Sequence, residues 1–242
     1  MNKLNTRNVE KKNISFFSKN SVYQKDIINI DTYKNIYVEI SKRLEGTNKL
    51  LDVGHGGVFD YNTKKIKKII GLDLNYMNYN NLPSNIKLIK GSILDKPKKK
   101  ELYDKVLMNM LLHHLTGKDI NENFINLNKS IDHSKKVLNK KGKLIIVESC
   151  VPYWFNFLEK IVYKPASKII LKYFNHPPVF QFTIAQIINV LKKKGFKKVN
   201  YKIIKQGNFI LQFGYKFPTI LTPVKTVLFT ARYNWIKKKG LQ

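Results

Sequence analysis

The sequence predicts an α/β protein with a Rossmann-like, doubly wound and mainly parallel sheet of seven strands. Three observations lead to this fold class. Short apolar runs alternate with helical segments, a glycine cluster at 54–57 follows the first run, and several runs end in a polar or acidic residue. Parallel strands covered by helices on both faces produce this alternation, because each right-handed crossover returns the chain to the same side of the sheet.

The expected elements follow from local periodicity and turn residues. Asp31 is placed to cap the first helix, and Gly46 is placed to end it. The expected helices comprise residues 32–44, a short one within 62–67, 121–138 and 183–194. The expected strands comprise residues 49–53, 68–73, 86–90, 103–109, 143–148, 199–204 and 226–231, with a turn at 139–142 before the fifth strand.

We expect one domain over residues 1–242, with an N-terminal arm at 1–30 and a helical, lid-like insertion at 151–182. The single cysteine, Cys150, has no partner for an internal disulfide, which favours a reducing compartment. No apolar run has the length of a signal-peptide core or of a membrane span. The sequence therefore indicates a soluble cytoplasmic protein.

The formal net charge of +29 leaves two interpretations open. A basic chain can bind nucleic acid or an anionic membrane surface. However, only Arg7, Arg43 and Arg232 are arginines, whereas phosphate and base recognition favours the arginine fork. Solvated surface lysine is therefore the alternative explanation of the charge.

The segment from Asp52 to Asp73 carries the clearest functional pattern. An acid, Asp52, stands just before Gly54, His55 and Gly56, and the next apolar run ends in Asp73. Glycine lets the backbone approach a ligand closely, and an acid at the end of the second strand can accept hydrogen bonds from both ribose hydroxyls. The pattern thus predicts a nucleoside site beyond the carboxyl ends of the strands.

The later strands end in polar residues at spacings that suit the same fold. Gly91-Ser92-Ile93 follows the third strand, Asn109 ends the fourth, His113 and His114 lie just beyond it, and Glu148 ends the fifth. In an open parallel sheet these positions meet at one edge, where ligands bind.

Taken together, these motifs resemble those of class I S-adenosylmethionine-dependent methyltransferases, over roughly residues 32–148 and the two closing strands. The small-molecule type, similar to the methyltransferase domain of ubiquinone and menaquinone biosynthesis, is the nearest in pattern. The resemblance implies S-adenosyl-L-methionine as cofactor. The cofactor-binding residues that it implies are Asp52, Gly54, His55, Gly56, Asp73, Leu74, Ser92, Ile93 and Asn109.

The sequence also departs from the family pattern. Val58 stands where glycine is common, and Ser92 replaces a common acid. The short interval between Asp73 and Ile86 leaves the second crossover helix short or absent. A dinucleotide fingerprint starting at Gly54 would need glycine at position 59, where Phe59 stands. A fold that has lost its ligand is the remaining alternative.

Methyl transfer from a sulfonium needs a base only where the acceptor must lose a proton. His114 is the first candidate for that base because it follows the fourth strand, and a purely structural histidine is the competing interpretation. His113, Glu148, Tyr153 and His176 are weaker candidates. No cluster of metal ligands is predicted.

Aromatic side chains with lysines between them fill the segment 151–182. They could pack on the sheet, form a lid over an apolar substrate, or contact a membrane surface. The segment favours a small or lipid-like organic acceptor, since the fourth strand is followed neither by the Pro-Pro motif of adenine-N6 enzymes nor by the nucleophilic cysteine of cytosine-C5 enzymes. A basic RNA-binding methyltransferase and a non-catalytic adaptor remain alternatives.

Overall fold

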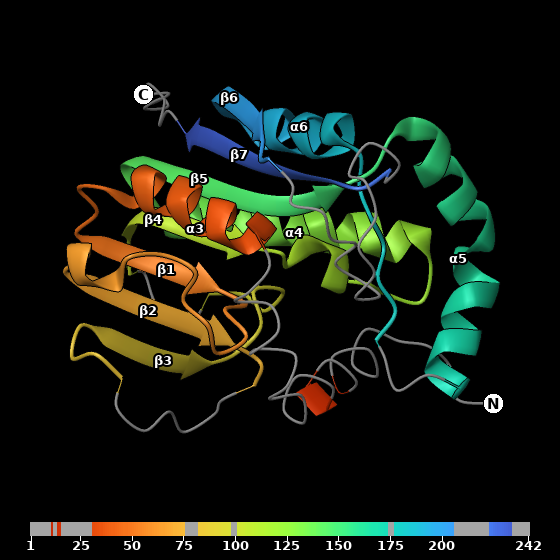
Figure 1. Cartoon of the computed structure of the whole chain (residues 1–242), viewed down its shortest axis with the longest axis horizontal. Coiled ribbons are helices and arrows are strands. Elements are labelled where there is room, and N and C mark those ends of the chain that lie inside the picture. The colour runs from red at the N-terminus through yellow and green to blue at the C-terminus, as the bar shows by residue number, and fades with distance from the viewer. Residues whose placement is uncertain are drawn as a thin grey trace, which may run out of the picture.

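The computed structural model describes residues 11, 14–15, 31–75, 82–97, 101–173, 177–205 and 223–233. A seven-stranded sheet with the order β3-β2-β1-β4-β5-β7-β6 forms its centre (Figure 1). The strands are β1 (Lys49–Val53), β2 (Lys68–Asp73), β3 (Ile86–Lys90), β4 (Tyr103–Asn109), β5 (Leu138–Cys150), β6 (Phe196–Ile203) and β7 (Lys225–Tyr233). The first five strands are parallel, and β7 runs antiparallel to both β5 and β6. The predicted fold class is confirmed.

Helices cover both faces of this sheet. They are α3 (Asp31–Leu44), α4 (Ile120–Val137), α5 (Tyr153–Tyr173) and α6 (Ile184–Lys193), with short 3-10 turns η1 (Thr63–Lys65) and η2 (Leu112–His114). The apolar face of α3 packs with Leu107 and Ile145, whereas α4 and α6 pack with Val106 and Leu144. Neighbouring residues of one strand therefore serve opposite cores, as a doubly wound sheet requires.

The helix starts follow from side-chain caps. The Asp119 carboxylate accepts a hydrogen bond from the Glu122 backbone N–H at the start of α4. Thr183 and Gln186 form a reciprocal capping box at the start of α6. Such caps satisfy N–H groups that have no partner within the helix.

Two expected elements differ from the structure. The strand β5 begins at Leu138 rather than at 143, because Leu138 pairs with Tyr103 before the register shifts between Tyr103 and Lys105. Residues 139–142, predicted as a turn, lie in this irregular start of the strand. The short helix expected within 62–67 is only the single turn η1, capped by Asn62.

The segment after β5 contains one long helix, α5, with an unusual distribution of polarity. Its buried side includes Asn156, Tyr163 and Ser167, while many of its apolar side chains are exposed. The following residues Phe180 and Phe182 are buried against Phe124 in edge-to-face contacts. Of the three roles left open for the aromatic residues of the segment 151–182, packing in the core describes Phe180 and Phe182, but it does not describe the exposed side chains of α5.

Some expectations fall outside the described residues, namely most of the N-terminal arm at 1–30 and His176. Within the described part of the chain, no helix combines the length and apolar character needed to cross a membrane.

The buried polar side of α5 contributes to stability, and Asn156 tests this. Its amide donates to the Gln181 carbonyl at 2.7 Å and accepts from the Gln186 side chain at 2.8 Å. We expect Asn156→Ala to lower the free energy of unfolding in urea by about 1–3 kcal/mol, because both partners lose a buried hydrogen bond. The exposed control Asn121→Ala should stay within about 0.5 kcal/mol of the wild type. Equal losses in the two variants would contradict this.

Candidate functional site

The carboxyl ends of β1, β2, β4 and β5 lie at one edge of the sheet (Figure 1). Apart from His176, which lies outside the described residues, the predicted site residues lie on or just beyond the five parallel strands, close to their carboxyl ends. Several of these residues contact one another, and the others contact residues that were not predicted for the site.

The glycine loop after β1 has a left-handed backbone. Gly54, Gly56 and Gly57 have φ values of 70°, 55° and 89°, a region that favours glycine. A Cβ on Gly54 would lie 2.6 Å from Leu111 Cδ1, so the loop also packs closely against the segment after β4. Beside Gly56, by contrast, a Cβ would meet no described heavy atom within 4 Å. The loop therefore presents bare backbone to open space at that point.

The loop is tied to the end of β2 by Asp73. The Gly56 N–H donates to Asp73 Oδ2 at 2.9 Å, and the Asn75 N–H donates to Asp73 Oδ1 at 2.8 Å. The predicted ribose-binding acid and the predicted glycine loop are thus in direct contact.

Two further acids, Asp52 and Asp60, lie close enough to one another to interact electrostatically, and Asp52 also interacts with Asp73. The Tyr61 hydroxyl donates to Asp52 Oδ2 at 2.7 Å, and the Asn109 amide donates to Asp60 Oδ2, also at 2.7 Å. Burial raises the pKa of Asp52 to about 8 and the pKa of Asp60 to about 6. A cationic ligand nearby would stabilise the ionised form of both carboxyl groups.

Asp60 and Tyr61 were not among the predicted site residues. The signal that could have identified them is the short interval between the glycine loop and β2, which has no room for a regular helix. An acid and a tyrosine within so short a connection must lie close to the edge of the sheet.

His55 supports the loop from within. Its ring stacks on Phe59 at 5.0 Å, and its Nδ1 accepts a hydrogen bond from the Gly57 N–H. Burial lowers the pKa of His55. A Cβ on Gly71 would lie 3.0 Å from the His55 ring, so this side chain lies over β2. The cofactor contact expected for His55 stays a prediction.

The residues beyond β3 are held by local contacts. Ser92 Oγ accepts from the Leu94 N–H at 3.2 Å, and the buried Ile93 contacts the His133 ring through its carbonyl oxygen. Leu74 is half-buried next to Asp73. The cofactor-binding role expected for Ser92, Ile93 and Leu74 stays a prediction.

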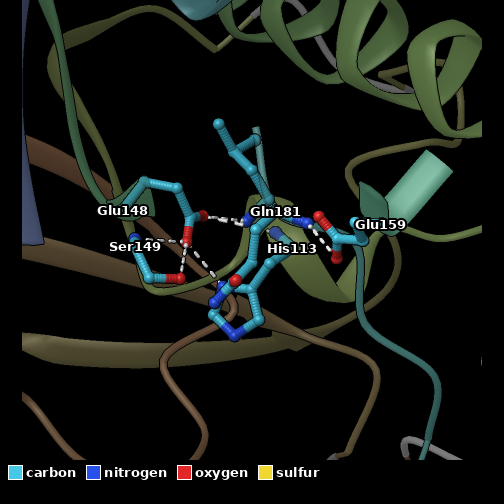
Figure 2. A network of polar contacts seen from close by, with 6 residues as sticks. His113, Glu148, Ser149, Glu159 and Gln181 are labelled. Atoms are coloured by element: carbon cyan, nitrogen blue, oxygen red, sulfur yellow. Dashed lines mark hydrogen bonds and ion pairs between the residues drawn. The ribbon is translucent and has the colours of Figure 1, made fainter. Parts of the chain in front are cut away.

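A fully buried carboxylate, that of Glu148, organises the end of β5 (Figure 2). Its Oε2 accepts from the backbone N–H groups of Leu112 at 2.7 Å and His113 at 3.3 Å. Its Oε1 accepts from the Ser149 N–H at 2.7 Å and hydroxyl at 3.2 Å. The same oxygen lies 2.5 Å from His113 Nδ1. These contacts satisfy a buried charge that would otherwise be costly.

His113 is consequently fixed through both its ring and its backbone. Its carbonyl oxygen accepts from the Phe180 N–H at 3.0 Å, and Glu148 contacts Nδ1 rather than Nε2. From α5, Glu159 lies close enough to interact electrostatically with His113. Burial raises the pKa of Glu159 to about 7, although the Gln181 N–H and His113 both act against this shift.

The structure distinguishes the two adjacent histidines. The ring centroids of His113 and His114 lie 4.1 Å apart, but the contact with Glu148 is made by His113. His114, the first candidate from sequence, remains a prediction as a base. Sequence alone could not choose between the neighbours because the choice depends on a partner on β5.

The backbone at the end of β4 is strained. Met110 has φ of 52°, a left-handed value that is rare for residues other than glycine, and its N–H donates to the Val147 carbonyl. Strain of this kind is concentrated at functional sites. It lies between Asn109 and the η2 turn that carries both histidines.

No family model matches the sequence, and neither does any curated protein. Solved structures do match. The chain resembles the 1,6-didemethyltoxoflavin-N1-methyltransferase of Burkholderia thailandensis, solved with its substrate and S-adenosylhomocysteine, at 12% identity and a TM-score of 0.58, covering 93% of this chain and 88% of that one. It also resembles a putative methyltransferase of Bacillus halodurans at 17% identity and a TM-score of 0.52, covering 85% and 99%. The chain therefore has the Rossmann-like fold of class I methyltransferases.

A third structure, an S-adenosylmethionine-dependent methyltransferase of Methanosarcina mazei, matches at 14% identity and a TM-score of 0.52, covering 83% of this chain and 99% of that one. These three structures thus share the fold with this chain over most of its length, although their sequence identity to it is low.

The raised pKa of Asp52 predicts how stability depends on pH. In the unfolded chain this carboxyl loses its proton near pH 4, but in the folded protein burial keeps the proton until about pH 8. The folded state is therefore destabilised as pH rises through this window. We expect the free energy of unfolding of Asp52→Asn, relative to that of the wild type, to increase as the pH rises from about pH 5 to about pH 8. A constant difference across the range would contradict the buried, protonated carboxyl.

Proposed function

We propose that this protein is an S-adenosyl-L-methionine-dependent methyltransferase that acts on a small or lipid-like organic acceptor by in-line displacement. The observation that supports it most is the hydrogen bond between Gly56 and Asp73, which joins a left-handed glycine loop to the acid at the end of β2. The fold is shared with methyltransferases, one of which was solved with the demethylated cofactor bound.

The residues at this edge suit such a cofactor. Asp73 can accept hydrogen bonds from the ribose, and the open backbone at Gly56 allows close approach. The buried carboxyls of Asp52 and Asp60 suit the positive charges of the methionine portion. Leu74, Ser92 and Ile93 are the proposed adenine contacts, with Asn109 holding Asp60. S-adenosylmethionine supplies a methyl group that its sulfonium already activates.

The chain itself must align the acceptor, exclude water and accept a proton where the acceptor carries one. Alignment can supply about 7–11 kcal/mol of the barrier. We propose that Nε2 of His113 accepts the proton that the methyl acceptor loses. Glu148 contacts Nδ1 and fixes the ring, as a third group orients the base in other catalytic sites. The proposal thus favours His113 over His114.

Cofactor binding can be measured without knowing the acceptor. S-adenosylmethionine at about 100 times its Kd should add about 2.7 kcal/mol to the free energy of unfolding, seen as a raised melting temperature. S-adenosylhomocysteine should act similarly, and NAD should not. Stabilisation by NAD alone would support the dinucleotide alternative, and no response to any of the three would support an adaptor that keeps the fold.

A pair of acid variants locates the binding site. Asp73→Asn should remove most of the melting-temperature shift that S-adenosylmethionine produces. The amide is uncharged and has only one acceptor oxygen, so it cannot accept charge-assisted hydrogen bonds from both ribose hydroxyls. Asp95→Asn, an exposed acid after β3, is the matched control and should keep the full shift. If both variants respond like the wild type, the ribose does not bind at Asp73.

The two neighbouring histidines offer a matched test of catalysis. With acceptors that react through oxygen, nitrogen or carbon, His113→Ala should lower kcat roughly 100- to 10,000-fold, the range expected for loss of a general base. The KM for S-adenosylmethionine should change little, because His113 is not among the residues proposed to bind the cofactor. His114→Ala should have the smaller effect, and the reverse order would return the role to His114.

A further inference from the structure

The helix α5 turns uncharged polar residues and Glu159 inward, and it exposes large apolar residues together with lysines. On the inward side, Asn156, Glu159 and Tyr163 hydrogen-bond to neighbouring segments. Amphipathic helices of soluble domains normally show the opposite arrangement, with apolar residues toward the core. The inverted arrangement therefore requires an explanation outside the described fold.

We define the outer face of α5 as Trp154, Phe157, Leu158, Ile161, Val162 and Ile169. Trp154 is 57% exposed, Phe157 52% and Ile161 62%. Single exposed apolar residues are normal, but a contiguous group marks an interaction surface. More than half of the large apolar side chains that are exposed in the described residues lie on this one helix. Figure 1 shows α5 at one end of the molecule, alongside the sheet's carboxyl edge.

The charges on α5 restrict what can cover this face. The sequence of α5 contains Lys160, Lys164, Lys168 and Lys172, and its one acid is Glu159. Glu159 is turned inward to Gln181, and Lys160 lies over the ring of Phe124. Lys164 and Lys168 are exposed beside the outer face. The surface thus combines apolar and aromatic side chains with positive charge.

We propose that the outer face of α5 docks onto an anionic lipid bilayer, with the helix lying in the plane of the interface. Aromatic and aliphatic side chains would enter the boundary between headgroups and acyl chains, while lysines remain at the anionic headgroups. At 21 residues the helix is about 31 Å long, enough to present several turns to the surface.

Charge complementarity favours this occupant over a second copy of the chain. The net charge of +29 makes two copies repel one another, whereas it attracts an anionic surface. A lipid surface also satisfies both halves of the pattern at once, because it offers apolar and anionic groups within one interface.

The proposed orientation would place the catalytic candidates next to the membrane. The same helix that presents the outer face also carries Glu159, which faces His113 on its inner side. A lipid-like acceptor, as in the proposed function, could then pass from the bilayer to the site without crossing water. The docking itself does not rest on methyl transfer.

Co-sedimentation of the full chain with vesicles tests the docking. We expect binding to vesicles of phosphatidylcholine with phosphatidylglycerol, and much weaker binding to phosphatidylcholine alone. Ile161→Glu should lower the partition coefficient about tenfold or more, since it removes an apolar side chain that the bilayer would bury. The matched control is Ile125→Glu on α4, where the side chain is 49% exposed, and it should bind like the wild type. Equal losses in both variants, or no binding at all, would overturn the proposal.

A second pair of variants separates local from overall charge. Replacing both Lys164 and Lys168 by glutamine should weaken binding about fivefold per lysine. The same change at the exposed Lys197 and Lys198 of β6 removes equal charge elsewhere, and it should weaken binding less. Equal effects would show that net charge, rather than the face of α5, drives the association.

Tryptophan fluorescence gives a readout at the face itself. With Trp235→Phe, Trp154 becomes the only tryptophan of the chain. A soluble quencher should reduce the emission of Trp154 in the free protein. With anionic vesicles, the emission maximum should shift to shorter wavelength. Protection before vesicles are added would show that another segment or a second copy covers the face. Polyuridylate that displaces the vesicles and binds Ile161→Glu unchanged would instead support an RNA partner.

Discussion

The buried carboxylate of Glu148 is the interaction on which the candidate site depends. A charge without access to water must be satisfied completely, and here backbone N–H groups, a hydroxyl and a histidine ring do so together. Because those partners come from both β5 and the turn η2, the carboxylate fixes the position of the turn relative to the sheet. The orientation of His113 follows from this requirement.

At the proposed cofactor site, carboxyl groups also organise the edge of the sheet, but they make fewer hydrogen bonds than Glu148 does. Asp73 holds the glycine loop through one hydrogen bond, and burial raises the pKa of Asp52 and the pKa of Asp60 because it disfavours their charged forms. The two sides differ in purpose. At one side the oxygens of Glu148 are already satisfied by hydrogen bonds, and at the other side a nearby cation would lower the raised pKa values of Asp52 and Asp60.

Strand positions, the fold class and the glycine loop could be predicted from the sequence because they depend on local patterns of apolar residues and glycine. The start of β5 at Leu138 could not, since a pairing with Tyr103 overrides the turn residues at 139–142. The choice of His113 over His114 depends on Glu148, which is distant in sequence. The inward position of the polar residues of α5 could not be predicted from the sequence either, because a helical pattern alone does not show which side of the helix packs against the rest of the protein.

An adenosine sulfonium is proposed to bind where the glycine loop meets Asp73. A crystal structure of the protein with S-adenosylhomocysteine would locate the bound compound. We expect density for the ribose hydroxyls at the Asp73 carboxylate and for the amino acid portion beside Asp52 and Gly54. A compound bound elsewhere, or the side chain of Phe59 or Tyr61 occupying the space beside Gly56, would contradict it.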